Sequence, residues 1–413
     1  MKKYYGHVDA FLEVSIYLYF VLMFLTMGEG IRNVMLYGNF MLWLLTVRHR
    51  DSVGALKNPV ALLLYANLGI AALSALFSID PSYSLMWMRK DVIKAFFLFP
   101  VIATVFSNET RLKRATLALC VAAVLITSVG YYSFFVYHME VLKPITPLMH
   151  TWHDRYARYA NTLIPFFFMA ALIWRGRWAR GVIFISASAS AVSVVLSTSR
   201  GGYAGLAAAG FIWLLYMFAK MGISMKKTLS AAFVAFLLVI MAAWFTVPGV
   251  KNRILLLRQQ LPTINNRLYT WEKAIEAVKM RPVLGFGCGE RIFTDPQVYN
   301  KTVFKLPPTT GPESTFIMVL YHQGVVGLTA YLILLAYAAK SFWRGAMERE
   351  GISSYAAAAC LCVIFGNYFV HSIVDVSLYL RHLAVVLAIG TAASLPIPNK
   401  PPLLQERGQG VRP

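Results

Sequence analysis

Charged residues are scarce in this 413-residue sequence, and acidic residues are the fewer of the two signs. Charged side chains make up 14% of the chain, whereas a soluble domain of this size carries roughly a quarter. Hydrophobic residues make up 58%, and 39 Lys and Arg against 18 Asp and Glu give a net charge of +21. The composition excludes an ordinary soluble domain and indicates a polytopic membrane protein.

Cysteine is also rare, with four residues in the whole chain. Cys120, Cys360 and Cys362 fall in apolar runs, so Cys288 stands alone outside them and no disulfide framework is expected. Cys360 and Cys362 are two positions apart and point in different directions on a helix. No histidines have a metal-ligand spacing, and no paired acids of the kind that hold Mg²⁺ occur. The sequence therefore predicts chemistry without a metal ion or other cofactor.

Apolar runs close to the length that a spanning helix needs follow one another along almost the whole sequence. They centre on residues 10–28, 33–47, 59–77, 91–106, 114–136, 157–174, 181–198, 202–219, 229–247, 314–339, 354–373 and 376–395. With no evident repeat and no soluble domain, residues 1–413 are expected to form a single integral membrane domain. The predicted fold is an all-α polytopic bundle of about twelve transmembrane helices.

Basic residues are concentrated in alternate connections between these runs. The rich connections carry Lys2/Lys3, Arg48/Arg50/Lys57, Arg111/Lys113/Arg114, Arg175/Arg177/Arg180, Lys220/Lys226/Lys227, Lys340/Arg344/Arg349 and Lys400/Arg407/Arg412. The positive-inside rule then places both termini in the cytoplasm, and the first run is interpreted as a retained span. Much of the positive charge is thereby a topology signal, which argues against a nucleic-acid partner.

One long connection, residues 248–313, falls on the outer, periplasmic side and carries ten basic residues that topology does not explain. Residues 265–290 predict a helix that Asn266 caps and Pro282 ends, followed by the glycine-rich turn "GFGCGE". Loops longer than about 15 residues in compact domains are often functional. The loop is therefore expected to cover a site at the outer membrane face.

Arg200 lies in a turn of a few residues between two apolar runs, before Gly201 and Gly202. One interpretation is an arginine that snorkels to lipid phosphates. The other is a phosphate clamp, because arginine offers a planar fork of donors and adjacent glycines allow a ligand to approach the backbone. The structured loop expected above the turn favours the clamp.

Arg267 and Glu313 are the other principal candidates. Arg267 is expected in the first turn of the loop helix, where a cation is mildly unfavourable unless an anion binds nearby. Glu313 follows Pro312 and is expected in the first turn of the next span. Arg267 is either an exposed basic residue or a second phosphate ligand. Glu313 is either an acid favoured by the helix dipole or a base that takes a proton from an attacking hydroxyl.

Further residues are candidates for lining the same cavity. His371, Asp375, Arg381 and His382 cluster near the outer end of the last two runs, and Arg291 lies in the loop. Arg291 is either solvated or a lining residue. His322 is predicted to pack within the bundle, because nine residues place it about 13 Å deeper than Glu313 on the opposite side of the helix.

Three motifs occur in order: "LSTSRGGYAGL", "NRLYTWEKAIEAVKMRPVLGFGCGE" and "GPESTFIMVLYHQGVVGL". Together they resemble the O-antigen ligase and polymerase superfamily, most strongly over residues 150–340. The resemblance implies a GT-C-like helical glycosyltransferase fold. It also implies transfer of a glycan from undecaprenyl diphosphate to a hydroxyl acceptor at the periplasmic face, with Arg200 and Arg267 binding the diphosphate.

The sequence departs from the ligase pattern at the base, because Glu313-Ser314 stands where the ligases have His-Asn. A carboxylate is competent for the same proton abstraction. The resemblance thus favours an inverting, metal-independent O-antigen ligase of the bacterial inner membrane, with lipid A–core as acceptor and membrane lipids as surroundings. A polymerase of O-antigen or exopolysaccharide is the alternative. A transporter of lipid-linked glycan is the remote third, because inverted repeats and mid-membrane charges are little in evidence.

Overall fold

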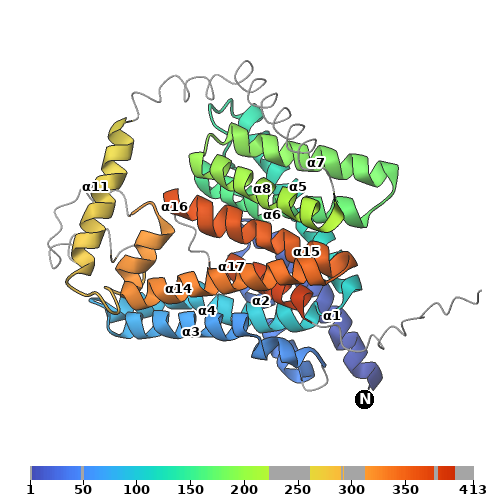
Figure 1. The fold of residues 1–413 in the computed structure, drawn as a ribbon, viewed down its shortest axis with the longest axis horizontal. Helices are drawn as coiled ribbons and strands as arrows, with labels where there is room; N and C mark the ends of the chain where they lie inside the picture. The colour runs from blue at the N-terminus through green and yellow to red at the C-terminus, as the bar shows by residue number, and fades with distance from the viewer. Residues whose placement is uncertain are drawn as a thin grey trace, which may run out of the picture.

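The computed structural model describes residues 2–47, 51–222, 261–289, 292, 312–375 and 380–395. The regular elements within these ranges are all helical (Figure 1). They are α1 (Lys2–Leu22), α2 (Glu29–Thr46), η2 (Asp51–Lys57), α3 (Pro59–Leu76), α4 (Pro81–Val105), α5 (Glu109–Val136), α6 (His153–Ile173), α7 (Arg177–Leu196), α8 (Arg200–Met221), α11 (Leu261–Val278), α14 (Thr315–Glu348), α15 (Gly351–Val363), η4 (Ile364–His371), α16 (Ser372–Val374) and α17 (Leu380–Ser394).

Six helices in the described ranges are long and apolar enough to cross a membrane, by length and composition. They are α3, α5, α7, α8, α14 and the continuous stretch Gly351–Val374. The all-helical character predicted from the sequence is confirmed for the described residues, and the six candidate spans are consistent with a polytopic membrane protein. The total of about twelve spans stays a prediction. The run expected at 229–247 lies outside the described residues.

Helix starts follow from local sequence. Asn58, Asp80 and Asn108 each cap the next helix by accepting a backbone N–H. Pro59 and Pro81 occupy the first helical position, where a missing N–H costs nothing. These signals separate α3, α4 and α5 into distinct helices joined by short turns.

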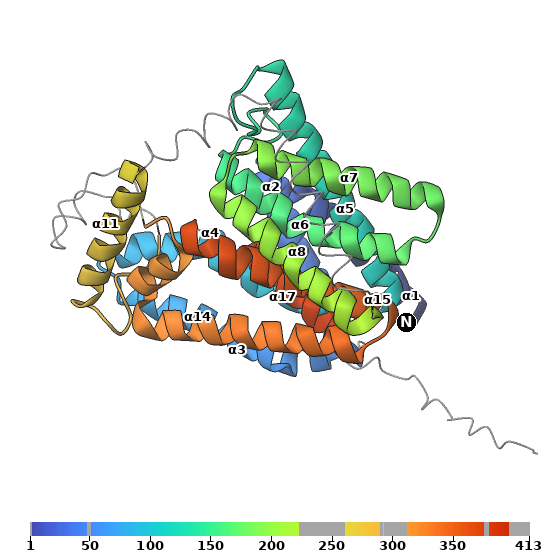
Figure 2. The same ribbon diagram turned by 45° about the horizontal axis from the view of Figure 1, so that its top comes forward.

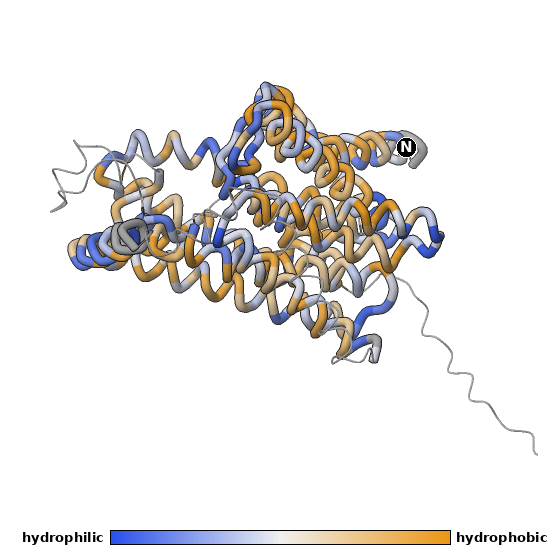
Figure 3. Tube along the Cα trace, turned by 90° about the horizontal axis from the view of Figure 1, so that it is seen from above, coloured by the Kyte–Doolittle hydropathy of each residue, from blue (hydrophilic) through white to orange (hydrophobic). Residues whose placement is uncertain are grey.

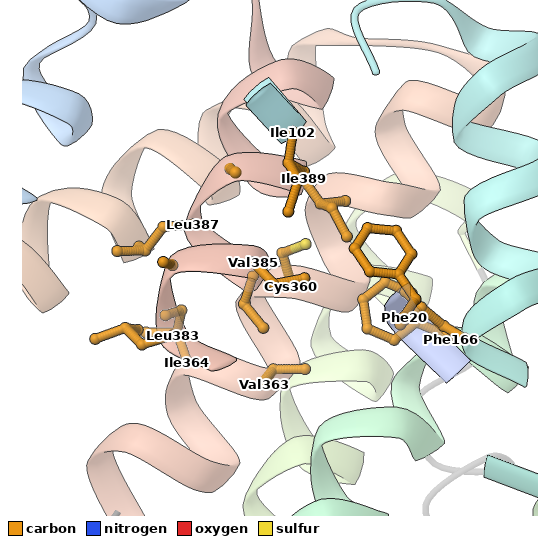
Figure 4. Packing of buried hydrophobic residues seen from close by; sticks show 14 of the residues in the cluster. Phe20, Ile102, Phe166, Cys360, Val363, Ile364, Leu383, Val385, Leu387 and Ile389 are labelled. Atoms are coloured by element: carbon orange, nitrogen blue, oxygen red, sulfur yellow. The ribbon is translucent and has the colours of Figure 1, made fainter. Parts of the chain in front are cut away.

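The centre of the bundle is α17, whose residues 382–393 are all buried. In Figure 4, Phe20 from α1, Ile102 from α4, Phe166 from α6 and Cys360 from α15 converge around this helix. Residues 356–359 of α15 are alanines with no exposed surface, so neighbouring helices approach closely. Figure 3 shows hydrophobic residues along the bundle, while α11 and the turns between helices are more hydrophilic.

The crossing of α8 and η4 depends on glycine. A Cβ added to Gly366 would lie 2.5 Å from the carbonyl oxygen of Gly205 and 2.9 Å from Cβ of Ala209. Neither backbone can yield without separating the helices. This contact, near the start of η4, sets how α8 crosses η4, and the candidate residue His371 lies at the other end of η4.

Gly366→Ala is expected to lower the free energy of unfolding by about 1–3 kcal/mol, because it overpacks this crossing. The measurement is thermal unfolding of the purified protein in detergent. Gly210→Ala on α8 is the matched control, since a Cβ there meets nothing within 4 Å. Equal melting temperatures for the two variants would contradict the proposed role of the contact.

α14 is broken at Gly324, whose φ of 65° and ψ of −166° are not helical. The segment after α11 fills the break. Phe286 and Gly287 donate backbone N–H groups to the carbonyls of Tyr321 and His322 at 3.0 Å each. On the other side of the break, Val325 donates to the carbonyl of Pro282 at 2.8 Å.

The glycine-rich turn after α11 therefore has a structural role. Gly285 has a φ of 67°, and an added Cβ would lie 2.5 Å from the His322 backbone, so only glycine fits. Because this segment satisfies the backbone groups that the broken helix leaves open, it fastens α11 to α14. Figures 1 and 2 show α11 beside the first part of α14.

Candidate functional site

The turn predicted at Arg200 is present. α7 ends at Leu196 and α8 begins at Arg200, with Ser199 accepting the N–H of Gly202 at 3.1 Å as the cap. Thr198 has a φ of 55°, unusual for a residue with a side chain, so the turn is tightly wound. Arg200 is half-buried at the first position of α8.

The two glycines after Arg200 allow protein neighbours to approach closely on the side where a Cβ would lie. A Cβ on Gly201 would lie 2.6 Å from Cδ2 of His371, and one on Gly202 would lie 2.8 Å from Cβ of Ala157. η4 and α6 thus occupy the Cβ side of these two glycines. As a result, His371 lies directly against the residue after Arg200.

Asp375 joins four helical segments at one point. Its Oδ2 accepts a hydrogen bond from Nη2 of Arg158 on α6 at 2.6 Å and lies 3.1 Å from Nε2 of His371. Its backbone carbonyl accepts the N–H and hydroxyl of Thr315, at 3.2 and 3.0 Å, at the start of α14. Asp375 thus ties α6, η4 and α16 to the residue that follows Glu313 and Ser314.

The charge state of Asp375 follows from these contacts. Burial acts to raise its pKa, but the Arg158 guanidinium and the hydrogen bond with His371 outweigh burial and hold the pKa well below its ordinary value. The carboxylate is therefore ionised at neutral pH. Because the pKa of Asp375 is lower in the folded than in the unfolded protein, its carboxylate stabilises the fold at pH values above its ordinary pKa of about 4. This contribution is lost progressively as the pH falls below about 4.

Asp375→Asn is expected to destabilise the protein by about 3 kcal/mol at neutral pH, because Arg158 keeps a buried charge without its carboxylate. Melting temperatures across pH 3–7 provide the check: the difference from wild type shrinks as the pH falls below about 4. Asp154→Asn, at a more exposed ion pair with His153, is the control. A difference that does not change with pH would show that charge is not the cause.

Arg267 and Glu313 form an ion pair between Nε and Oε2. Their side chains are 29% and 36% exposed, so the pair lies at the edge of the protein rather than in its core. Sequence reasoning predicted both residues at one site but did not predict that they contact each other.

The helical positions predicted for both residues are wrong by about one turn. α11 (Leu261–Val278) already includes residues 261–265, so Asn266 does not cap it and Arg267 lies inside the helix. Glu313 precedes α14, since Ser314 is extended with φ −153° and ψ 127°. The predicted cost of a cation in the first helical turn does not apply to Arg267.

The remaining candidates lie as follows. His322 is buried against the rings of Trp87 and Tyr321, in agreement with a packing role. Arg381, in the first turn of α17, is close enough to His382 for its charge to act there. Arg291 lies outside the described residues. Arg158 was missed, although an arginine within an apolar run is the signal that identifies such residues.

The contacts place these groups at one end of the bundle. Gly201 touches His371, His371 bonds Asp375, and Asp375 holds Thr315 at the start of α14. Figure 1 shows α16 reaching the end of the bundle where α11 lies. Fold and site together define an integral membrane protein with arginines and a paired carboxylate at one helix-bundle end.

Comparison with known proteins finds a family model that matches part of the chain. Residues 184–332 match the family model described as "O-Antigen ligase", a stretch that contains Arg200, Arg267 and Glu313. This part of the chain is therefore similar to the O-antigen ligase family, in agreement with the resemblance that the three motifs carry.

Two curated relatives are more distant. "Putative polysaccharide ligase RP358" of Rickettsia prowazekii (strain Madrid E) is 20% identical over 324 residues, which cover 74% of this chain and 73% of the relative. "Putative polysaccharide ligase RT0347" of Rickettsia typhi (strain ATCC VR-144 / Wilmington) is 21% identical over the same length and the same shares.

Proposed function

We propose that this protein transfers O-antigen polysaccharide from undecaprenyl diphosphate to lipid A–core at the periplasmic face of the inner membrane. The observation that carries the proposal is the contact between Glu313 and Arg267 at the bundle end where α8 begins with Arg200. A base and a phosphate-binding cation must both lie close to one carbon in such a site, on opposite sides of it, and the contact between Glu313 and Arg267 brings the two groups within reach of one substrate. The family match and the names of the two relatives support the same reaction class.

The proposed reaction is a single displacement. A carboxylate oxygen of Glu313 takes the proton of the acceptor hydroxyl, and the hydroxyl oxygen forms a bond to the anomeric carbon of the glycan. The bond from that carbon to the diphosphate oxygen breaks, and undecaprenyl diphosphate leaves with the electron pair. Arg200 and Arg267 stabilise the charge on the leaving group, so no metal ion is required. Attack opposite to the leaving group inverts the anomeric configuration.

The surroundings suit these substrates. The apolar helices provide the environment for the polyprenyl chain, and the basic residues of the 248–313 loop attract a phosphorylated acceptor. In this orientation both termini are cytoplasmic and the loop is periplasmic. A specific feature favours a second candidate: Glu313-Ser314 replaces the His-Asn of the ligases, as in some polysaccharide polymerases that the sequence resembles.

A strain lacking the gene separates the two candidates. Without a ligase, lipid A–core migrates as a bare band while full-length polymer accumulates on the lipid carrier. Without a polymerase, lipid A–core carries single repeat units and no ladder forms. Bare core together with long carrier-linked polymer is the expected result, and single-unit core would overturn the ligase assignment.

A further inference from the structure

The ion pair between Arg267 and Glu313 is reciprocal. Among the described residues, the Glu313 carboxylate has one charged partner, Arg267, and the Arg267 guanidinium has one acidic partner, Glu313. Other acids of α11 lie elsewhere: Glu276 pairs with Lys273 at 2.7 Å. Arg267, which is proposed to bind the diphosphate, is therefore paired with Glu313, which is proposed to act as the base.

Both partners are held by fixed backbone. The end of α11 is fastened into the break of α14 at Gly324 and packs through Ala274 and Ala277 against Tyr321. The start of α14 is held by Asp375 through Thr315. The pair thus joins two segments whose backbones are held by these contacts.

We propose that this pair is the resting state of the site and that the donor diphosphate displaces Glu313 from Arg267, which releases the carboxylate to act as base. The inference rests on the proposed function. The contact with Glu313 uses Nε of Arg267, and a diphosphate offers more charge and more acceptor oxygens than a carboxylate, so the two anions compete for this donor. Base release is thereby coupled to donor binding, so Glu313 is set free only when a glycosyl diphosphate is in place.

Competition of this kind has a measurable consequence. If Glu313 competes with the diphosphate for Arg267, removing the carboxylate charge must strengthen diphosphate binding, although it removes the base. The pair is partly exposed, and such pairs contribute up to about 1 kcal/mol. Glu313→Gln is therefore expected to bind undecaprenyl diphosphate about three- to fivefold more tightly than wild type.

The experiment is a double-mutant cycle on equilibrium binding of undecaprenyl diphosphate to the purified full-length protein in detergent. The four proteins are wild type, Glu313→Gln, Arg267→Ala and the double variant, with Arg267→Gln in place of Arg267→Ala where the alanine variant is not recovered. The gain from Glu313→Gln is expected to vanish when Arg267 is absent. Glu276→Gln on the same helix is expected to leave binding unchanged.

Two results would overturn the proposal that the diphosphate displaces Glu313 from Arg267. One is binding by Glu313→Gln that is no tighter than wild type. The other is an equal gain in the Arg267→Ala background, which would reflect general removal of negative charge. The transfer activity of Glu313→Gln is measured separately. Tighter diphosphate binding with full activity would support the displacement of Glu313 but exclude Glu313 as the base. Lost activity without tighter binding would support Glu313 as the base and exclude the displacement.

Discussion

Glu313→Gln is expected to lower the rate of glycan transfer by about 10²- to 10⁴-fold, the contribution of a positioned general base. Glutamine keeps the size of the side chain but cannot accept the hydroxyl proton. The measurement is single-turnover transfer from undecaprenyl-diphosphate-linked glycan by the purified protein. Because the donor is bound before the chemical step, the loss is expected in the rate of that step rather than in donor affinity.

Two further variants test whether Glu313 acts as a proton acceptor. Glu313→His introduces the side chain that the resemblance assigns to the ligases and is expected to retain measurable transfer, with a rate that rises through pH 6–7 as imidazole loses its proton. Glu276→Gln, on an exposed ion pair of α11, is the matched control and is expected to retain the wild-type rate. Full activity in Glu313→Gln would remove Glu313 from the mechanism.

Arg200→Ala is expected to lower transfer by about 10²- to 10³-fold, the usual cost of removing one charge-stabilising donor from a transition state. The residue begins α8 in a tight turn, so its backbone is fixed before substrate arrives. Arg200→Lys is expected to recover part of the loss, because an ammonium restores charge but not the fork of donors.

The matched control is Arg177→Ala, an exposed arginine that begins α7 at the opposite end of that helix from the Arg200 turn. It is expected to transfer at the wild-type rate. If Arg200→Ala and Arg177→Ala were both fully active, Arg200 would be a lipid-facing anchor and the phosphate clamp would be excluded.

Much of the fold was predictable because bilayer-length apolar runs constrain a chain strongly. The turn at Arg200 follows from two runs separated by a few polar residues. The start of α11 was predicted incorrectly, because residues 261–265, before the expected Asn266 cap, are already helical. Asparagine is favoured at a helix cap but is also accepted inside a helix, so this residue alone does not fix the start.

The candidate residues could be selected from the sequence, but their contacts could not. Arg200, Arg267 and Glu313 were selected for their places in the turn, the loop helix and the start of the next span, whereas the pairing of the last two depends on the break in α14 that seats the end of α11. The bond between Arg158 and Asp375 joins positions 217 apart in sequence, and nothing local encodes it. The roles of Gly201 and Gly202 likewise could not be predicted, because they depend on neighbours from η4 and α6 that are distant in sequence.

The most direct test of the proposed function is reconstitution of the purified protein with undecaprenyl-diphosphate-linked glycan and lipid A–core in the presence of EDTA, followed by gel mobility of the lipid A–core. The proposal predicts a ladder of lipid A–core with wild type and none with Glu313→Gln or Arg200→Ala. Lengthening of the glycan on its own lipid carrier, with lipid A–core unchanged, would contradict the ligase and identify a polymerase.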